Sequence, residues 1–410
     1  MKKETKKAPT IRFRDFTDDW EQRKFSELYA RSSEKNNGSI GMDKNITVAT
    51  MQFKNDVKVS TTEYLKTYYT FKLGDIAFEG HQNKEFRYGR FIENDIGNGI
   101  VSHIFAVFRP IQEYDLYFWK YAINNETLMQ RILARSTKAS TMMHDLVTND
   151  FLNETFLVPS VKEQKQIGAF LNKLDNLITL HQRKLDQLKT LKKYFLQNMF
   201  PAKGEKVPRI RFEGFTGDWE QHKLSDLVEK ICVGFVGTCE KYYTDVADGI
   251  PMYRTGDLSG FALNHTGIKY VTREFHKKNK KSQLKYGDIL IARHGDSGKA
   301  IVYDRNEEAN CLNIVIIRPN SARCNGKFLA QRINTFSVSH KIKKMAAGST
   351  QIVINTTDIE KLILQIPKSL NEQAKIISYF ISIDNLITLH QRKLNQLQTM
   401  KKFMLQNLFI

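Results

Sequence analysis

The sequence predicts an α+β protein made of two tandem domains of mixed α/β structure, with two long helices that pair as an antiparallel coiled coil and a pseudo-two-fold internal repeat. Three observations predict this fold. A segment at the start of each half is duplicated, a segment at the end of each half is duplicated, and the second of these carries a long apolar stripe. The 410 residues are enough for two to three domains that each bury a core.

The duplication is visible directly in the letters. Residues 10–28 recur at 209–227 with 12 of 19 positions identical, and residues 175–198 recur at 384–407 with 19 of 24 identical. Between these segments the halves agree only in outline, because short strand-like runs fall at similar places while most residues differ. A period near 200 residues indicates a duplicated domain and not a solenoid.

The repeat divides the chain into two globular domains, two helical spacers and a linker with a proline near each end. The first domain covers 1–158, the first spacer 159–200, the linker 201–209, the second domain 210–366 and the second spacer 367–410. Within the domains, β-branched and aromatic runs such as DIAFEG and DILIAR predict strands. The stretches LYFWKYAINNETLMQRIL and FLAQRINTFSVSHKIKKMA predict helices.

Apolar residues recur every three or four positions from Ile167 and again from Ile376, which is a heptad stripe sustained for more than four heptads. Its 33 residues span roughly 50 Å, more than the roughly 34 Å of one DNA turn. The residues expected to form the seam and the partner-binding part of these helices are Leu174, Ile178, His181, Leu185, Leu188, Ile383, Ile387, His390, Leu394 and Leu397.

Antiparallel pairing is favoured because it turns the duplication into a pseudo-two-fold. It places His181 beside Leu394 and His390 beside Leu185, so the duplicated histidine is interpreted as a polar layer that sets register. A metal ligand is the alternative, but no further ligand-type residue accompanies the histidine at ligand spacing. A second alternative, in which each helix packs only on its own domain, does not explain why the outer faces of the two helices also match.

The formal net charge of +19 points to a polyanionic partner. Nucleic acid is favoured over an anionic membrane, because no apolar run of 18 residues is present. The basic N-terminus lacks the apolar stretch of a secretory signal, so a cytoplasmic location is expected. The four cysteines show no CxxC spacing, and reduced thiols without a zinc site are expected.

The sequence carries none of the common catalytic motifs. The chain has no phosphate loop, no GxSxG or HExxH string, no tetrapeptide of the amino-methyltransferase type and no nuclease-type carboxylate-lysine cluster. We therefore expect no catalytic residue, no metal and no cofactor in this chain. The duplicated Trp20 and Trp219 are interpreted as core anchors, with base stacking as the alternative.

Residues that read DNA sequence are expected where the two halves differ, because shared contacts position the backbone while base-edge contacts encode sequence. Cations and small hydroxyl residues in loops after the predicted strands suit guanine edges and phosphates. The candidates are Lys84, Arg87, Tyr88, Arg90, Arg135, Ser136, Thr137, Lys138, Arg254, Arg293, His294, Ser297, Lys299, Gly348, Ser349, Thr350 and Gln351. The lysine run at 277–281 is either a solvated cluster or a backbone contact.

The strings IRFxxFTxDWEQxKxSxL and DNLITLHQRKL…QN, each present twice, resemble those of the specificity subunit of type I restriction-modification systems. The resemblance covers essentially the whole chain. It implies two target recognition domains that each read one half of an interrupted, asymmetric site in double-stranded DNA. It also implies that the helices set the spacer and dock two modification subunits, which carry S-adenosylmethionine and methylate adenine. Two restriction subunits would then supply ATP- and Mg-dependent translocation and cleavage.

Two other interpretations remain open from the residues alone. One is a stand-alone repressor or architectural protein with two unlike DNA-reading domains. The other is a DNA enzyme whose catalytic site is too irregular to recognise.

Overall fold

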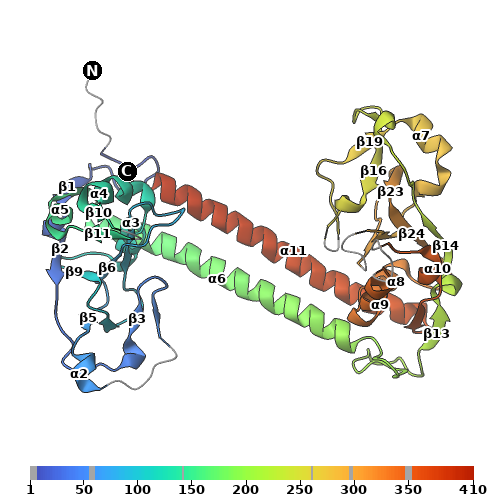
Figure 1. The fold of residues 1–410 in the computed structure, drawn as a ribbon, viewed down its shortest axis with the longest axis horizontal. Coiled ribbons are helices and arrows are strands. Elements are labelled where there is room, and N and C mark those ends of the chain that lie inside the picture. Colours follow the sequence, from blue (N-terminus) through green and yellow to red (C-terminus); the bar gives the residue numbers. More distant parts are fainter. Residues whose placement is uncertain (1–6, 55–60, 141–142, 260–261, 295–298, 347–352) are drawn as a thin grey trace. The chain divides into compact units, whose positions relative to one another are not determined.

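The computed structural model describes residues 7–54, 61–140, 143–259, 262–294, 299–346 and 353–410. These residues form two compact units, drawn as ribbons in Figure 1: unit 1 (Met1–Arg183 with His390–Ile410) and unit 2 (Lys184–Leu389). The division falls within both long helices. Each unit is therefore one globular domain together with part of each helix, whereas the sequence divides domains from spacers.

Unit 1 is built on a four-stranded antiparallel sheet in the order β2-β9-β6-β7, with two-stranded pairs β1–β12, β3–β4, β5–β8 and β10–β11. Its strands are β1 (Glu21–Lys24), β2 (Tyr29–Ser32), β3 (Ile46–Thr47), β4 (Gln52–Phe53), β5 (Tyr69–Phe71), β6 (Ile76–Glu79), β7 (Arg90–Glu93), β8 (Gly99–Val101), β9 (Ala106–Pro110), β10 (Thr137–Ala139), β11 (His144–Leu146) and β12 (Thr155–Val158). Its helices are α1 (Phe25–Leu28), α2 (Thr62–Leu65), α3 (Leu116–Ile123), α4 (Glu126–Ser136), α5 (Thr148–Asn153) and the first part of α6 (Val161–Asn198).

The core of unit 1 gathers aromatic side chains beneath this sheet. Trp20, Phe118 and Trp119 are buried there together with Leu408 and Phe409 from the end of the chain. The Phe118 and Phe409 rings lie 5.6 Å apart between centroids. The burial of Trp20, and of its counterpart Trp219 in unit 2, confirms that these tryptophans are core anchors.

Unit 2 repeats the same scaffold with the strand order β14-β24-β21-β22 and the pair β13–β25. Its strands are β13 (Glu220–Lys223), β14 (Val228–Val233), β15 (Tyr243–Thr244), β16 (Ile250–Arg254), β17 (Leu258–Ser259), β18 (Ala262–Leu263), β19 (Lys269–Val271), β20 (Gln283–Leu284), β21 (Ile289–Ala292), β22 (Ala300–Val302), β23 (Ala309–Leu312), β24 (Ile314–Pro319) and β25 (Ile363–Ile366). Its helices are α7 (Arg273–Lys278), α8 (Gly326–Ile333), α9 (Phe336–Ala346), α10 (Thr356–Glu360) and the first part of α11 (Leu370–Asn407).

The two units differ in the strands inserted into this scaffold. Unit 2 carries a five-stranded sheet, β15-β19-β16-β23-β20, at the chain positions where the described residues of unit 1 form the pairs β3–β4 and β5–β8. The α+β class is as predicted. As also predicted, the two units share a scaffold and differ in the segments between its elements.

Each helical stretch predicted after the sheet is in fact two helices. Asp115 and Asn325 cap α3 and α8 by accepting hydrogen bonds from the backbone N–H groups of Phe118 and Phe328. Short turns containing asparagine then separate α3 from α4 and α8 from α9. Asparagine competes for backbone hydrogen bonds, which explains why a continuous helix does not form there.

The predicted apolar stripe of the long helices is buried or half-buried at every position named above, from Leu174 to Leu188 and from Ile383 to Leu397. In unit 1, Asp175 of α6 pairs with Lys401 of α11 at 2.6 Å, and His181 faces His390. The sequence places these histidines in separate layers beside Leu394 and Leu185. In the structure their Nδ1 atoms lie 2.9 Å apart, because one ring donates a hydrogen bond to the other.

Candidate nucleic-acid interface

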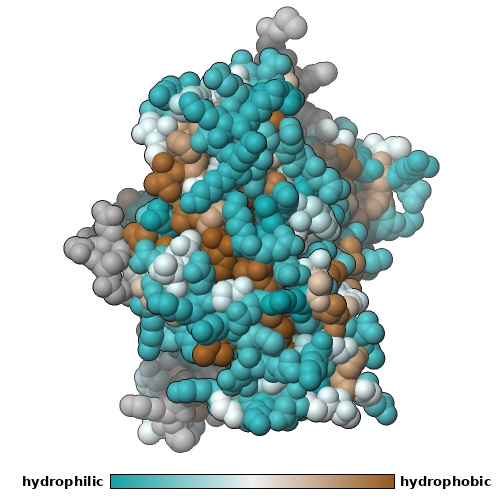
Figure 2. All heavy atoms as spheres, turned by 90° about the vertical axis from the view of Figure 1, so that its right-hand side faces the viewer, coloured by the Kyte–Doolittle hydropathy of each residue, from teal (hydrophilic) through white to brown (hydrophobic). Residues whose placement is uncertain are grey.

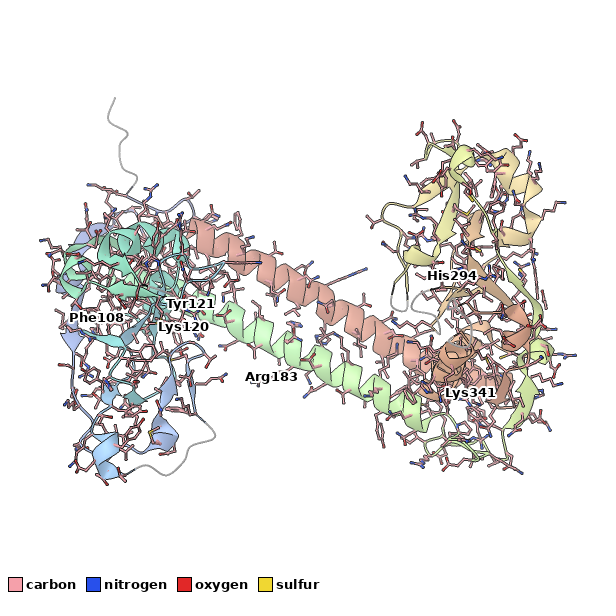
Figure 3. All side chains as sticks on the ribbon, in the orientation of Figure 1. Phe108, Lys120, Tyr121, Arg183, His294 and Lys341 are labelled. Carbon is pink, nitrogen blue, oxygen red and sulfur yellow. The ribbon has the colours of Figure 1, made fainter. Side chains whose placement is uncertain are left out.

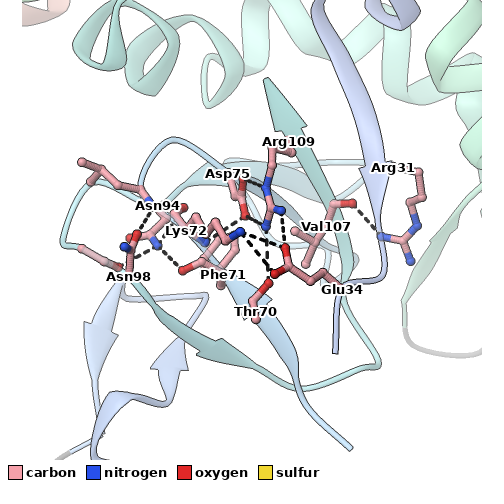
Figure 4. Close-up of polar contacts among 12 residues, drawn as sticks. Arg31, Glu34, Thr70, Phe71, Lys72, Asp75, Asn94, Asn98, Val107 and Arg109 are labelled. Carbon is pink, nitrogen blue, oxygen red and sulfur yellow. Dashed lines mark hydrogen bonds and ion pairs between the residues drawn. The ribbon is translucent and has the colours of Figure 1, made fainter. Parts of the chain in front are cut away.

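The first duplicated polar contact joins the Gly-Asp motif to the Arg-Pro motif of each domain. In unit 1 the Asp75 carboxylate accepts two hydrogen bonds of 2.9 Å from the Arg109 guanidinium (Figure 4). In unit 2 Asp288 accepts two hydrogen bonds of 2.7 Å from Arg318. Both aspartates are buried, and these bonds raise the pKa of each arginine. The shared motif is therefore a structural tie within the sheet.

In unit 1 this tie extends to the surface. Arg109 also donates to Glu34, which accepts a further bond from Lys72, as Figure 4 shows. The two cations lower the pKa of Glu34 to about 2, chiefly through the Arg109 hydrogen bond.

The second duplicated contact fixes the start of each long helix. Arg12 donates to both oxygens of the buried Glu163 at 2.7 and 2.8 Å, and Arg211 donates to both oxygens of Glu372 at 2.8 and 2.9 Å. Paired parallel bonds of this kind set an angle as well as a distance. The repeated strings at the two ends of each half thus meet each other, and the residues that the halves share build the scaffold.

The loop between β6 and β7 carries the first group of predicted DNA-binding residues. The Asn83 side chain accepts hydrogen bonds from two backbone N–H groups and closes a turn, on which Lys84 and Arg87 are exposed. Arg90 is less free, because it bonds Glu79 at 2.8 Å and its guanidinium lies over the ring of Phe86. Lys84 and Arg87 are therefore the cations that this loop presents to solvent.

The β10–β11 hairpin lies against this loop. The N–H of His144 donates to the carbonyl of Gly80 at 2.8 Å, and the ring of Tyr88 packs edge-on against His144 at 5.4 Å. A side chain at Gly80 would clash, because its Cβ would lie 2.1 Å from the His144 carbonyl oxygen. The exposed Lys138 lies on this hairpin. The structure therefore brings the β6–β7 loop and the segment around Lys138 together, which the sequence alone did not predict.

Three residues predicted beside Lys138 make contacts within unit 1. Ser136 is fully buried, and its hydroxyl donates to the Ile132 carbonyl, while Thr137 donates to Leu133. Each hydroxyl thus bonds the carbonyl four residues earlier in the last turn of α4, and that of Leu133 is one that the helix itself leaves without a donor. Arg135 is tied to Glu154 by a salt bridge with a 2.7 Å contact at Nε. The prediction of a phosphate contact is therefore wrong for the buried Ser136, and it stays a prediction for Arg135 and Thr137.

In unit 2 the corresponding segments also meet. The backbone carbonyl of Arg293 accepts the N–H of Ile354 at 3.2 Å, and the Arg293 N–H donates to the Asn313 carbonyl. His294, labelled in Figure 3, follows directly and is half-buried, as is Lys299. The predicted residues Ser297, Gly348, Ser349, Thr350 and Gln351 lie outside the described residues.

Arg254, also predicted to bind DNA, is held at the end of β16 by Asp257, which accepts its backbone N–H at 2.8 Å and lies 3.3 Å from its guanidinium. The Thr255 hydroxyl donates to the same Asn313 carbonyl that accepts the Arg293 N–H. The β16 end and the Arg293 segment therefore share one anchor.

Figure 2 shows that the face of the molecule at the unit 2 side is largely hydrophilic, with separate apolar patches.

Helix α3 contacts the long helix α6 through Tyr121, whose hydroxyl donates to Asp175 at 2.6 Å. Lys120 lies beside Tyr121 (Figure 3). A cavity of about 840 Å³ opens beside them, lined by Phe86 of the β6–β7 loop, by Glu126 and by Lys401 among others. Sequence reasoning did not single out Glu126. The signal that could have found it is the Asn-Asn pair that interrupts the predicted helix just before it.

The outer faces of the long helices carry apolar residues that the stripe does not bury. These residues, called the exposed apolar sets, are related by the 209-residue repeat, so that each unit holds one copy drawn from both helices. The set of unit 1 is Leu180, Met400 and Phe403, and the set of unit 2 is Leu389, Leu191 and Tyr194, with 40% to 61% of each residue exposed.

Within the described parts of the chain, no three His, Cys, Asp or Glu side chains are grouped so as to hold a metal ion. The four cysteines are free and buried. No described helix is both long and apolar enough to cross a bilayer.

Comparison with known proteins agrees with this architecture. Residues 17–190 and 216–399 both match the family described as type I restriction modification DNA specificity domain. The chain is 25% identical over 301 residues to the type I restriction enzyme MjaVIII specificity subunit of Methanocaldococcus jannaschii, covering 70% of this chain and 68% of that protein. It is 21% identical over 261 residues to the type I restriction enzyme EcoBI specificity subunit of Escherichia coli, covering 59% of this chain and 54% of that protein.

Solved structures share the fold. The crystal structure of a type I restriction-modification S subunit from M. genitalium superposes with a TM-score of 0.60 at 15% identity, over 98% of this chain and 99% of that one. A chain from a study of complex assembly and conformational transition of the type I R-M system gives a TM-score of 0.51 at 14% identity, over 94% and 96%. With both halves of the chain matched by the family, this protein belongs to the specificity subunits of type I restriction-modification systems.

Proposed function

We propose that each unit reads one half of an asymmetric, bipartite DNA site. The observation that carries this proposal is the contrast between an identical scaffold and unlike loops. The Asp–Arg tie, the Arg–Glu tie and the strand order recur in both units, whereas the loop after β6 and the loop after β21 differ in sequence. A duplicated DNA-binding domain with the same scaffold but different loops would recognise two different half-sites.

The exposed cations of unit 1, Lys84, Arg87 and Lys138, are the proposed DNA contacts there, with Tyr88 and Arg90 supporting the loop. In unit 2 the proposed contacts are Arg293, His294 and Lys299, with Arg254 beside them. An arginine on a loop tip can bond O6 and N7 of guanine together, which discriminates against other bases. The net charge of +19 supplies the long-range attraction for phosphates.

The long helices are proposed to pair as an antiparallel coiled coil with pseudo-two-fold symmetry and to set the spacer between half-sites. Support comes from two ion pairs that the repeat relates: Asp175 with Lys401 in unit 1, and Asp384 with Lys192 in unit 2, each at 2.6 Å. Each helix has 38 residues, about 57 Å of helix, which exceeds the roughly 34 Å of one DNA turn.

The exposed apolar sets are proposed to dock two methyltransferase subunits, one on each unit. Large apolar side chains left exposed on a helix surface suit a protein interface, and the two sets are copies of each other, which fits two copies of one partner. In this proposal the chain itself is not catalytic. S-adenosylmethionine belongs to the modification subunits that methylate adenine, and ATP and Mg belong to two restriction subunits.

A domain exchange tests the reading function. Residues 30–155 are replaced by the same segment of another family member, and the chain is co-expressed with the methyltransferase encoded beside it. Sequencing of methylated adenines is expected to show a change in one half-site alone. A simultaneous change in both half-sites would contradict separate reading, and a chain that associates with no methyltransferase would be a stand-alone DNA-binding protein.

A helix insertion tests the spacer function. One extra helical turn after Gln187 together with one after Gln396 adds about 5 Å to the paired helices. The methylated motif is expected to keep both half-sites and to gain spacer length. An unchanged spacer would contradict this role.

Single substitutions test the docking sites. Phe403→Asp and Tyr194→Asp each place a charge in one exposed apolar set. Native mass spectrometry of the purified complex is expected to show one methyltransferase subunit with either variant, none with the double variant, and two with the wild type. Gln396→Glu, on an exposed position of the same helix, adds the same charge and is the control. Two bound subunits in the double variant would place docking elsewhere.

A further inference from the structure

The turn between the two helices that follow each sheet reaches the loop in which the proposed DNA contacts lie. In unit 1 this turn joins α3 to α4 and contains Asn124 and Asn125. In unit 2 it joins α8 to α9 and contains Asn334. Asn124 and Asn334 occupy equivalent positions, since each directly follows the isoleucine that ends the preceding helix.

In unit 1 the turn contacts the middle of the loop. Glu126 is the first residue of α4, and its Oε1 accepts a hydrogen bond of 3.2 Å from the backbone N–H of Arg87. Its other oxygen is buried and meets no hydrogen-bond partner among the described residues. The carboxylate is therefore committed to the loop backbone, and burial raises its pKa.

The same turn is also bonded to the long helix. The Asn125 side chain caps α4 by accepting the N–H of Thr127 at 3.0 Å and donates to the Leu405 carbonyl of α11 at 3.3 Å. The α3–α4 turn, whose Glu126 accepts the Arg87 N–H, is thus itself bonded to the long helix α11.

In unit 2 a different side chain does the same task at the equivalent turn. The Asn334 Oδ1 accepts the N–H of Ala300 at 2.7 Å, and its Nδ2 donates to the Ala300 carbonyl at 2.8 Å. Ala300 is the first residue of β22 and directly follows Lys299, so these two hydrogen bonds fix the end of the loop after β21. The two units therefore anchor unlike loops from the same place with unlike chemistry.

We propose that Glu126 and Asn334 are positioning residues for sequence reading, and that each fixes the loop that reads one half-site. The inference rests on the proposed function, because it assumes that these loops read DNA. A base-edge hydrogen bond requires its donor within a few tenths of an ångström of the right place. A loop without its anchor has to be ordered when DNA binds, and that ordering opposes binding.

The test uses the full chain in complex with its methyltransferase, and compares Glu126→Ala with Asn334→Ala. Glu126→Ala is expected to lower methylation about three- to tenfold at sites of the wild-type motif and to admit other bases in the first half-site only. Asn334→Ala is expected to relax the second half-site only, by about tenfold, because it removes two bonds. Each variant is thus the matched control for the other.

Conservative variants separate positioning from folding. Glu126→Gln keeps an acceptor for the Arg87 N–H and is expected to restore the first half-site, whereas Glu126→Met fills a similar volume without an acceptor and is expected not to. Hydrogen exchange is expected to be faster at the Arg87 amide in Glu126→Met and unchanged at Ala300. Glu113→Ala, which removes an exposed carboxylate from the same unit, is expected to behave as the wild type.

The possible results are distinct. A wild-type complex that methylates no bipartite motif would refute the proposed function and this role with it. A normal wild-type motif that both alanine variants leave intact, or that either variant relaxes in both halves together, would refute the positioning role alone.

Discussion

Replacing Glu93 by glutamine is expected to stabilise unit 1 increasingly as the pH rises. Glu93 ends β7, is 2% exposed, and neither of its carboxylate oxygens meets a hydrogen-bond partner among the described residues. Burial is the main reason why its pKa is raised well above the usual value, and the nearby Asp95 and Asp115 add to this. The folded protein therefore keeps this proton when the unfolded chain would release it.

The sign follows from proton binding. Above a pH of about 4.5, the unfolded chain loses the Glu93 proton while the folded chain retains it, so unfolding becomes more favourable as the pH rises. One such group lowers the free energy of unfolding by about 1.4 kcal/mol per pH unit until the pH passes its folded pKa. Glutamine has no proton to lose, so the gain of the variant over the wild type should grow by about 1.4 kcal/mol for each unit.

The assay is urea unfolding between pH 5 and 8, followed by tryptophan fluorescence. The chain has three tryptophans, of which Trp20 and Trp119 lie in unit 1 and Trp219 in unit 2. A Trp219→Phe background therefore reports on unit 1 alone, and other titrating groups cancel when Glu93→Gln is compared with its parent.

Glu113→Gln, at an exposed position, is the control and should leave the pH dependence unchanged. A difference between Glu93→Gln and its parent that stays constant with pH would mean that Glu93 is already ionised in the folded protein and would refute the argument.

Two further predictions concern the duplicated contacts. Glu163→Ala and Glu372→Ala each leave a half-buried arginine without its carboxylate and should cost about 1–3 kcal/mol of unfolding free energy. Glu372→Ala should cost about 1 kcal/mol more, because Glu372 also accepts the indole N–H of Trp219. Urea unfolding measures both, and equal losses would contradict the added Trp219 bond. Desolvation is the main cause that lowers the pKa of His181, and the nearby His390 adds to this effect. The stability that the neutral His181 ring contributes is therefore present above the usual histidine pKa and is lost as the pH falls below it. Hydrogen exchange at the amides near His181 should therefore lose protection, after correction for intrinsic rates, between pH 7.5 and 5.5, and a double leucine variant of the two histidines should show no such loss; an equal loss in both would contradict the argument.

The candidate site could be predicted only in part. Lys84 and Arg87 were identifiable because cations next to turn residues after a strand are a local pattern, and the structure leaves both exposed. Lys138 and Ser136 were identifiable as a cation and a small hydroxyl residue close together in the chain. Lys138 is exposed, but Ser136 is buried, because α4 continues to it and its hydroxyl is used at the helix end. Glu126 was missed because its role depends on Arg87, which lies 39 residues earlier in the chain.

By itself the sequence determined the duplication, the α+β class, the family and the course of the long helices. These follow from letter-by-letter repetition and from a periodicity that extends over a few turns, both of which are local properties of the chain. Only the tertiary structure decided which side chains meet. Arg12 bonds Glu163, which lies 151 residues away in the chain, Arg109 bonds Asp75, 34 residues away, and His181 bonds His390, 209 residues away. Such pairings depend on how the elements pack around a common core, and no spacing in the sequence encodes the distance between them.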